Sequence, residues 1–540
     1  MDGVCLRYTE LPGTSRLFAD YLYDFGKVAR FYRHAPREAS SFAASRDEIQ
    51  YPASRRSALV SALSKINSPD SPNLKKLAQP GTVCIVTGQQ VGLFTGPAYT
   101  IFKAITAATA ARELTANGTP TVPVFWLATE DHDFAEIAAA HVFDSSSNVQ
   151  TLRVTTIGAP DRPVGTIMPD GGFPLDALET ALQGLPFAGE VMTLVRKAHD
   201  GNVTMGSAFR ESVRSLLAPL DLIFLDPLKP EVRAIGAPFL RDAVLNAGEL
   251  YPKLLERNSE LTAAGYHAQV HIEPDTSLFF LLADKGLGGG SPNDDGRRIA
   301  LKRQPDGTYA AGKDIRLTTR DLAARAASIS PNALLRPVLQ DYLLPSIAYV
   351  GGPAELAYFA QSEVLYTGLL GRMPVMLPRN SYSLVSKRSQ KLLARYELTL
   401  PQALVRSEKL RDAVSAKLVP DTIHDLFAES ETQTRAILDR LDTALRTFDP
   451  SLAKALGKSR AKMLYQLSKM GKKAAREALR RDERASAEAQ YLSNQLFPQE
   501  HPQERFFSIL PFIAQYGPDL IGQLVDHSCL DCVDHHILYV

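Results

Sequence analysis

The chain has 540 residues, which is too long for a single hydrophobic core, so two or more structural units are expected. Its 60 basic and 59 acidic residues give a net charge of +1 without a polybasic tract, which argues against nucleic acid as a partner. Apolar stretches stay well below the roughly 20 residues that cross a bilayer, and residues 1–20 lack the apolar region of a signal peptide. We therefore expect a cytoplasmic protein with neither a nucleic-acid nor a membrane partner.

The chain then shows the pattern of a βαβ unit. The first 80 residues have a helical pattern and end in a connector rich in proline and serine, after which the apolar run TVCIVTGQQ begins at Thr82. A glycine-rich turn follows, then a helical segment that stops at Asn117-Gly118, then the apolar run VPVFWLAT. This order predicts parallel strands, and the ligand crevice of such a sheet lies at the carboxyl ends of its strands.

Three further apolar runs, at residues 220–227, 348–355 and 373–379, extend the predicted sheet. Two interruptions separate these runs, and we expect them to be insertions at about residues 145–218 and 279–328. The first contains short alternating segments and turns, and the second contains a Pro-Asp-Gly turn signal that indicates a small β-structure. The pattern as a whole predicts an α/β core.

The composition changes after this core, which we expect to span residues 1–385. Residues 386–497 are poor in proline and glycine, and the sequence Asp449-Pro450 separates two helical segments, which predicts an antiparallel helical hairpin. Such a hairpin commonly pairs with a second subunit, so we expect a homodimer. Residues 498–540 return to short helices and loops, and we expect them to pack back on the core. The two helical segments carry apolar stripes formed by Ile423, Phe427, Ile437, Leu441, Leu445 and Phe448, and by Leu452, Leu456, Met463, Leu467, Met470 and Ala474.

The turn GQQVGLFTGP is the first candidate binding element. Its glycines recur at every fourth position, which matches neither the dinucleotide-binding pattern nor a P-loop. Glycines allow close backbone approach and amides that open a helix attract anions, so the turn suits a carboxylate or a phosphate. A purely structural turn would also explain the glycines, but it explains the polar pair at the strand end less well. The candidate substrate-binding residues are Gln89, Gln90, Gly92, Thr95 and Gly96.

The segment ATEDHDFAEI, just past the second strand, is the candidate catalytic element. His132 is suited to general acid or base chemistry, with Asp131 or Asp133 beside it to orient the ring or to share a metal ion. The alternative is a helix N-terminus, where carboxylates are favoured by the helix dipole and the histidine is incidental. We assign His132, Asp131 and Asp133 as candidate catalytic residues.

The block from Ser330 to Phe359 is the third candidate element. Three of its polar residues recur at four-residue intervals, which would align them on one face of a helix. A Gly-Gly-Pro turn after an apolar run then opens a helix in a way that favours anions. An arginine at the end of MPVMLPR adds a positive charge at a further strand end. The candidate substrate-binding residues are Asn332, Arg336, Gln340, Gly351, Gly352, Glu355 and Arg379.

The C-terminal tail contains a run of cysteine and histidine. Cys529, Cys532, His535 and His536 have spacing that could hold zinc through sulfur and nitrogen donors. A single short loop would have to wrap the ion almost alone, so a reduced and partly buried tail is the preferred interpretation. We predict no metal site, and these four residues are the candidates if there is one.

Together these motifs resemble one known family. The segments TGQQVGLFTGPAYTIFKAI, PVFWLATEDHDFAEI, SPNALLRPVLQDYLLPSIAYVGGPAELAYFAQ, MPVMLPR and QERFFSILPFIAQYG are similar to those of BshC, the cysteine-adding enzyme family of bacillithiol biosynthesis. The resemblance implies a Rossmann-like core similar to class I aminoacyl-tRNA synthetases, with two connecting-peptide insertions. It also implies an α-helical antiparallel coiled-coil domain that mediates dimerisation, and a nucleotide pocket apart from the main cleft.

The resemblance further implies a reaction, the addition of L-cysteine to the amine of glucosaminyl-malate. Because a carboxylate and an amine do not condense usefully in water, the carboxylate must be activated, which suggests ATP or ADP as a nucleotide ligand. In this picture Gln89, Gln90 and the turn amides bind anionic groups, Arg336 and Arg379 hold malate or phosphate, and His132 assists proton transfer. Two alternatives are another nucleotide-dependent synthetase-like or tRNA-modifying enzyme, and a non-catalytic coiled-coil interaction protein.

Overall fold

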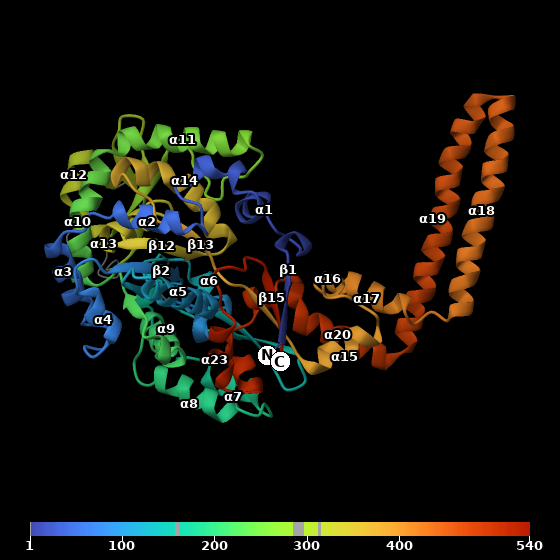
Figure 1. Cartoon of the computed structure of the whole chain (residues 1–540), viewed down its shortest axis with the longest axis horizontal. Helices are drawn as coiled ribbons and strands as arrows, with labels where there is room; N and C mark the ends of the chain where they lie inside the picture. The colour runs from blue at the N-terminus through green and yellow to red at the C-terminus, as the bar shows by residue number, and fades with distance from the viewer. Residues whose placement is uncertain (1, 157–160, 284–295, 312–314) are drawn as a thin grey trace. The chain divides into compact units, whose positions relative to one another are not determined.

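A computed structural model describes residues 2–156, 161–283, 296–311 and 315–540 (Figure 1). The chain forms two compact units. The first unit contains residues 3–382 and 504–537, and the second contains residues 383–503 with residue 2 and residues 538–540. The sequence placed the corresponding boundaries at residues 385 and 497.

A five-stranded parallel sheet forms the centre of the first unit. Its strand order is β13-β12-β2-β3-β6, and every neighbouring pair is parallel. Each strand overlaps one of the five apolar runs in the sequence, which confirms the predicted Rossmann-like α/β core. The strands are β2 (Val83–Gln89), β3 (Thr121–Leu127), β6 (Ile223–Leu225), β12 (Ser346–Gly351) and β13 (Val375–Pro378).

Helices cover both faces of this sheet. Successive residues of a strand point to opposite faces, so Val83 and Ile85 pack against helix α5 (Tyr99–Ala116), which connects β2 to β3. Cys84 and Val86 belong to the larger core on the other face, which includes helix α14 (Pro353–Leu369). The parallel strands therefore end together at one edge, where Gln89 is opposite Leu127.

The N-terminal region is helical, as expected, except for an initial strand. Strand β1 (Asp2–Leu6) is a neighbour of the C-terminal strand β15 (His535–Tyr539) in a small sheet. The helices that follow are α1 (Arg16–Tyr23), α2 (Ala39–Asp47), α3 (Ala53–Leu63) and α4 (Pro72–Leu77).

The first insertion is mainly helical, which corrects the expectation of short alternating segments. It opens with the short helix α6 (Phe134–Ile137) and an antiparallel hairpin that begins before residue 145. The side chains of Thr204 and Ser207 form a capping box at the start of the last helix, α9, and this pair is a helix signal in the sequence. The remaining elements are β4 (Ala139–Phe143), β5 (Val149–Arg153), α7 (Leu175–Leu182), α8 (Ala188–Ala198) and α9 (Met205–Leu216).

The second insertion contains an antiparallel sheet of order β10-β9-β8-β7-β11, as its turn signal predicted. The predicted range of 279–328 includes residues 284–295 and 312–314, which lie outside the described residues. The sheet and its surroundings comprise β7 (Thr276–Leu282), β8 (Arg298–Arg303), β9 (Tyr309–Ala311), β10 (Ile315–Leu317), β11 (Ile329–Pro331) and α12 (Thr319–Ala324). Three longer helices, α10 (Pro230–Leu245), α11 (Ala247–Ala263) and α13 (Arg336–Leu343), flank it in sequence.

The second unit is helical and contains the predicted hairpin. Helices α18 (Asp421–Phe448) and α19 (Pro450–Arg481) are joined at Asp449, whose side chain accepts a hydrogen bond from the Ser451 amide (2.8 Å) at the start of α19. The two helices run side by side over their length (Figure 1). This confirms the antiparallel coiled-coil region and its break at Asp449-Pro450. The other elements are β14 (Tyr382–Val385), α15 (Lys387–Arg395), α16 (Leu400–Ala403), α17 (Ser407–Ala416) and α20 (Glu483–Leu496).

Much of the apolar surface of this hairpin is open. The side chains of Ile437, Leu441, Phe448 and Met463 are 62%, 44%, 81% and 49% exposed, although all four belong to the stripes found in the sequence. Leu438, in contrast, is buried in α18. One hairpin therefore leaves most of its apolar stripe in contact with solvent.

The C-terminal segment of the first unit contains short helices and strand β15. These helices are α21 (Gln503–Phe506), α22 (Leu510–Tyr516) and α23 (Asp519–Asp526). None of the helices in the described part of the chain combines the length and apolar character needed to span a membrane.

Candidate active site

A cavity of about 550 Å³ lies at the carboxyl ends of β2, β3 and β12, where the sequence predicted a crevice. Eight of the predicted residues line it: Gln89, Gln90, Asp131, Asn332, Arg336, Gly352, Glu355 and Arg379. The other predicted residues do not line the cavity, as far as the chain is described. They are Gly92, Thr95, Gly96, His132, Asp133, Gln340 and Gly351.

A buried lysine anchors the floor of the cavity. Lys103, on α5, is 1% exposed. Its Nζ donates hydrogen bonds to the Gly88 carbonyl (2.6 Å), to Gln89 Oε1 (3.1 Å) and to Glu355 Oε1 (2.8 Å). Burial lowers the pKa of Lys103, although the Glu355 carboxylate opposes that shift. The lysine therefore ties the end of β2 to the start of α14.

Glu355 has its hydrogen-bonding capacity filled by its own chain. Its Oε1 also accepts from Tyr349 Oη (2.6 Å), and its Oε2 accepts from the Gly352 amide (2.8 Å). Burial alone would raise the pKa of Glu355, but the Lys103 charge and the Gly352 amide hold it below its ordinary value. The start of α14, which the sequence suggested for an anion, thus already holds a carboxylate.

Arg336 provides a positive charge whose hydrogen-bond partners are uncharged. Its guanidinium donates to Gln340 Oε1 (3.3 Å) and to Tyr358 Oη (2.9 Å). Gln340 is buried and supports the arginine from behind, rather than lining the cavity. The expected alignment on one helix face holds for Arg336 and Gln340, whereas Asn332 lies before the start of α13.

Arg379 is neutralised by a carboxylate from the C-terminal segment. Its Nη1 donates to Glu504 Oε2 (2.8 Å) and its Nη2 donates to the other oxygen, which makes a bidentate pair. Both side chains are 5% exposed, and Glu504 also accepts from Ser381 Oγ (2.8 Å). The prediction that Arg379 holds malate or phosphate is therefore not supported by its charge environment, although the residue lines the cavity.

His132 is outside the cavity lining but contacts two lining residues, Phe280 and Arg298, of the second insertion. Its Nδ1 is 3.0 Å from Arg298 Nη1 and 3.6 Å from Asp131 Oδ1, and its ring packs against Phe280. Because a guanidinium can only donate, Nδ1 accepts from Arg298 and the ring proton of neutral His132 is on Nε2. His132 is thus held as a donor at Nε2.

The two aspartates beside His132 have different environments. Asp131 accepts from Gln90 Nε2 (2.6 Å) and lines the cavity. Burial acts to raise its pKa, but the hydrogen bond from Gln90 and the charge of Arg298 lower it below the ordinary value. Asp133 instead caps α6 by accepting from the Glu136 amide (3.1 Å), as in the helix N-terminus alternative.

Backbone amides of the glycine turn form hydrogen bonds within the turn. The Gly92 amide donates to the Gln90 carbonyl (2.9 Å), and the Gly96 amide donates to the Leu93 carbonyl (3.0 Å). A Cβ atom on Gly92 would come within 3.0 Å of the Gly96 backbone, so close packing explains this glycine. These amides are not directed at a ligand, which corrects the expected anion cradle.

The backbone of this turn is strained and held from outside. Phe94, Thr95 and Gly96 have φ values of 48°, 75° and 66°, a region that side-chain-bearing residues seldom adopt. Ser508 Oγ donates to the Phe94 carbonyl (2.9 Å) and lies 3.3 Å from Thr95 Oγ1. The C-terminal segment therefore supports the conformation of the turn.

The tail histidines and cysteines separate into two groups, which changes the set suggested by the sequence. His535 Nδ1 pairs with Ser381 Oγ (2.6 Å), next to Glu504. His536 and Cys532 instead lie beside Cys5 of the N-terminal strand. Sequence spacing could not have included Cys5, which is more than 500 positions away.

The parallel sheet and the charged cavity at its strand ends define a Rossmann-like protein with a candidate small-molecule site. Residues 1–380 match the domain described as "Bacillithiol biosynthesis BshC, N-terminal Rossmann-like domain". Residues 382–540 match "Bacillithiol biosynthesis BshC, C-terminal coiled-coil domain". The chain belongs to the BshC family.

Full-length relatives agree with this assignment. The chain is 45% identical to "Putative cysteine ligase BshC" of Solibacter usitatus, with 100% of both chains covered. It is 36% identical to the protein of the same name from Koribacter versatilis, with 99% of each covered. A solved structure named as a putative arginyl t-RNA synthetase from Campylobacter jejuni is 8% identical, with a TM-score of 0.20 over 87% of this chain and 98% of the other. That score is too low to support an argument about fold.

Proposed function

We propose that this protein is a cysteine ligase that joins the carboxyl group of L-cysteine to the glucosamine amine of glucosaminyl-malate, forming the amide bond of bacillithiol. Membership of the BshC family and the names of its relatives support the ligase assignment. The cavity volume of about 550 Å³ is within the range of small-molecule sites, which runs from roughly 300 to 1,000 Å³.

The position of Arg336 carries the proposal. It lines the cavity, its hydrogen-bond partners Gln340 and Tyr358 are uncharged, and the nearby Glu355 carboxylate is already held by Lys103. An arginine fork suits a carboxylate, and the malate group of the substrate carries two carboxylates. Asp131 also lines the cavity and provides a negative charge, shared with Arg298 (3.7 Å), that suits the ammonium group of cysteine or of the sugar. Arg336 and Asp131 thus give the lining charges of both signs.

The chemistry requires an activated cysteine carboxylate. The sugar amine attacks the activated carbonyl carbon, a C–N bond forms, the C–O bond to the leaving group breaks, and the nitrogen passes one proton to solvent. We propose that His132 assists by donating from Nε2, because Arg298 occupies Nδ1, and that Asp131 positions the residue by accepting a hydrogen bond from the His132 backbone amide (2.7 Å). Of the acid and base roles that the sequence left open for His132, this proposal selects a donor role toward the developing negative charge.

The energy source is proposed to be ATP, with ADP as the related ligand, on chemical grounds alone. The residues at the strand ends do not form a phosphate cradle. The amides of Gly92 and Gly96 donate within their turn, and the amide of Gly352 donates to Glu355. We therefore derive no step through a nucleotide at these positions.

We further propose that the protein forms a homodimer through α18 and α19. The exposed apolar residues of the hairpin, which include Ile437 (62%) and Phe448 (81%), form a stripe that a second helical pair would cover. Burying such residues stabilises association by about 1.5 to 3 kcal/mol for each large side chain that is fully covered.

The activity is tested by incubating purified protein with glucosaminyl-malate, L-cysteine and ATP, followed by mass spectrometry. The expected product has the summed mass of the two substrates less one water. If no product forms with ATP or with a chemically activated cysteine donor, the ligase assignment is wrong, and an interaction scaffold becomes the better account. Activity on a transfer RNA in place of glucosaminyl-malate would instead support the tRNA-modifying alternative.

A further inference from the structure

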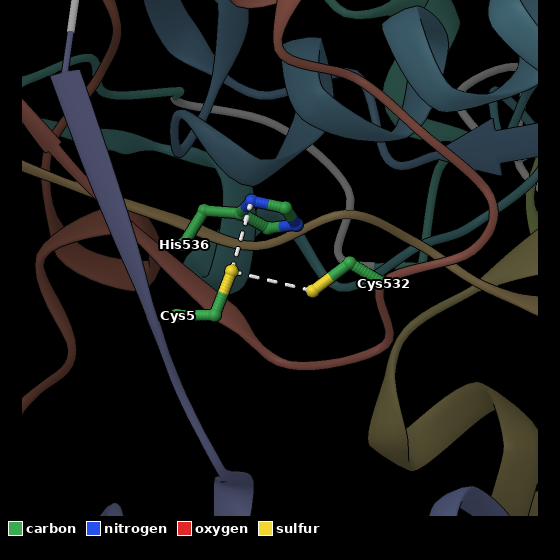
Figure 2. Close-up of side chains that lie close together, drawn as sticks. All are labelled: Cys5, Cys532 and His536. Carbon is green, nitrogen blue, oxygen red and sulfur yellow. Dashed lines mark hydrogen bonds between the residues drawn. The ribbon is translucent and has the colours of Figure 1, made fainter.

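Three soft-metal ligands from the two ends of the chain meet at the surface of the first unit. Cys5 belongs to β1, Cys532 lies in the loop before β15, and His536 belongs to β15. Cys5 Sγ lies 3.3 Å from Cys532 Sγ and 3.7 Å from His536 Nδ1, and all three ligand atoms lie within 4.8 Å of one another (Figure 2). None of the three lines the cavity of the candidate active site.

The fold, rather than a local motif, brings these side chains together. Strands β1 and β15 are neighbours in one sheet, which places Cys5 beside His536. Successive residues of a strand point to opposite faces, so His535 is directed away, toward Ser381. The set therefore differs from the Cys529, Cys532, His535 and His536 run that the sequence suggested.

The geometry matches a zinc ion. With Zn–S bonds of about 2.3 Å and Zn–N bonds of about 2.0 to 2.1 Å, tetrahedral ligands lie roughly 3.6 Å apart for S and N and roughly 3.8 Å apart for two S atoms. The observed separations are 3.7 Å and 3.3 Å. A shift of a few tenths of an ångström in one thiol would admit the ion.

The surroundings also suit a bound cation. Cys5 is exposed and Cys532 is partly exposed, so an ion can enter from solvent, whereas His536 is buried and fixed. The Nε2 of His536 is buried without a hydrogen-bond partner among the described residues, so Nδ1 is the ring atom that engages the thiols. Its ring packs against Tyr382, which holds Nδ1 in position.

We propose that Cys5, Cys532 and His536 bind one Zn²⁺ ion per chain, with solvent in the fourth position. On binding, each thiol releases its proton and the two thiolates and the imidazole Nδ1 coordinate the ion. The ion joins the N-terminal strand to the C-terminal strand. Its role is structural, because it links residues more than 500 positions apart and an ion that binds only the folded state stabilises that state.

The test uses the full-length protein, stripped of metal with a chelator under reducing conditions and titrated with Zn²⁺ against a chromogenic chelator. We expect one equivalent to bind, and Co²⁺ in its place to give the absorption of thiolate-to-cobalt charge transfer. The variants Cys5→Ser, Cys532→Ser and His536→Gln should each lower the affinity by on the order of 100-fold or more. Wild-type protein should also melt at a higher temperature with Zn²⁺ than without it, and Cys5→Ser should lose this difference.

Cys529→Ser is the matched control, because it removes a nearby tail cysteine outside the three-residue set. It should bind Zn²⁺ as the wild type does. Three outcomes would overturn the proposal: substoichiometric binding by the wild type, unchanged binding by Cys5→Ser, or loss of binding in Cys529→Ser. Formation of a Cys5–Cys532 disulfide in air that added Zn²⁺ does not prevent would also overturn it, and would identify a redox pair instead.

Discussion

The strand-end cavity and the helical hairpin use the same charged residue types in opposite ways. Around the cavity, Lys103 pairs with Glu355, and Arg379 pairs with Glu504, in sites where the side chains are largely or fully buried. On the hairpin, Arg435 pairs with Glu431 and Arg446 with Asp442 at i,i+4 spacing on the helix surface. Water screens the second group and hardly reaches the first.

The comparison shows which interactions determine the structure of the site. Removing one member of a buried pair leaves an uncompensated charge and costs about 3 to 5 kcal/mol, whereas an exposed pair contributes about 0 to 1 kcal/mol. The apolar residues follow the reverse pattern, since those of the sheet are covered within the chain and those of the hairpin are exposed. The core is therefore complete in one chain, and the hairpin surface is suited to a second copy.

The largest expected effect comes from breaking the Arg379–Glu504 pair. Glu504→Gln should lower the free energy of unfolding of the first unit by about 3 kcal/mol, because Arg379 then lies buried without a counter-charge. Urea unfolding can be followed through the fluorescence of Trp126, the single tryptophan, which is 1% exposed in this unit. A loss below 1 kcal/mol would show that water or another group compensates Arg379.

Substitutions on the hairpin surface should weaken dimer formation and leave the stability of the first unit unchanged. The double variant Ile437→Glu, Leu441→Glu places charges on the exposed apolar stripe and should weaken the proposed dimer on the order of 100-fold or more. Analytical ultracentrifugation measures the change, and Trp126 fluorescence provides the control that the core is intact. A wild-type protein that stays monomeric at high concentration would contradict the proposed homodimer.

Acid should affect the first unit through its buried histidines, of which His199 is one and His535 another, before its carboxylates respond. Burial lowers the pKa of His199, whose Nδ1 pairs with the Val195 carbonyl (2.7 Å). Below its ordinary value of 6.5 the unfolded chain therefore binds a proton that the folded chain does not, so stability falls as the pH falls below 6.5. Urea titrations of wild type and His199→Gln between pH 7 and 5 should give a flatter profile for the variant. Parallel profiles would contradict the assignment.

The smallest effect is expected at the hairpin surface. Arg435→Ala and Glu431→Ala, combined in a double-mutant cycle, should show a coupling energy of about 0.3 to 0.5 kcal/mol that decreases with added salt. Thermal unfolding followed by circular dichroism of the helices measures this energy. A coupling energy above 2 kcal/mol would make this exposed pair comparable to the buried Arg379–Glu504 pair. It would contradict the difference between buried and exposed ion pairs.

The sequence predicted the sheet because each strand is a continuous apolar run, and it located the cavity because parallel strands end together. It also identified Arg336 and Asp131, which follow those strands or open the neighbouring helix. It missed Lys103, although a lysine within the apolar helix segment TIFKAI was a signal that could have revealed it. It could not predict that Glu504 neutralises Arg379, since these residues meet only through the tertiary fold.

The same limit applies to the glycine turn and to the tail. The turn's glycines were visible, but whether their amides face a ligand or each other depends on backbone conformation, which the pattern does not specify. Cys5 likewise joins Cys532 and His536 only because β1 and β15 are neighbours. Local spacing predicts local sites, and contacts between distant segments have to be seen in the fold.

Arg336 is the residue proposed to receive the carboxylates of glucosaminyl-malate in the cavity, and it is central to the proposed function. The most direct test compares kcat/KM for glucosaminyl-malate in Arg336→Met and in Arg435→Met, which removes an arginine from the exposed hairpin surface. We predict a loss of about 100-fold for Arg336→Met, corresponding to one charge-assisted interaction, and no significant change for Arg435→Met. Equal activity of the two variants, at the level of the wild type, would contradict the proposed site.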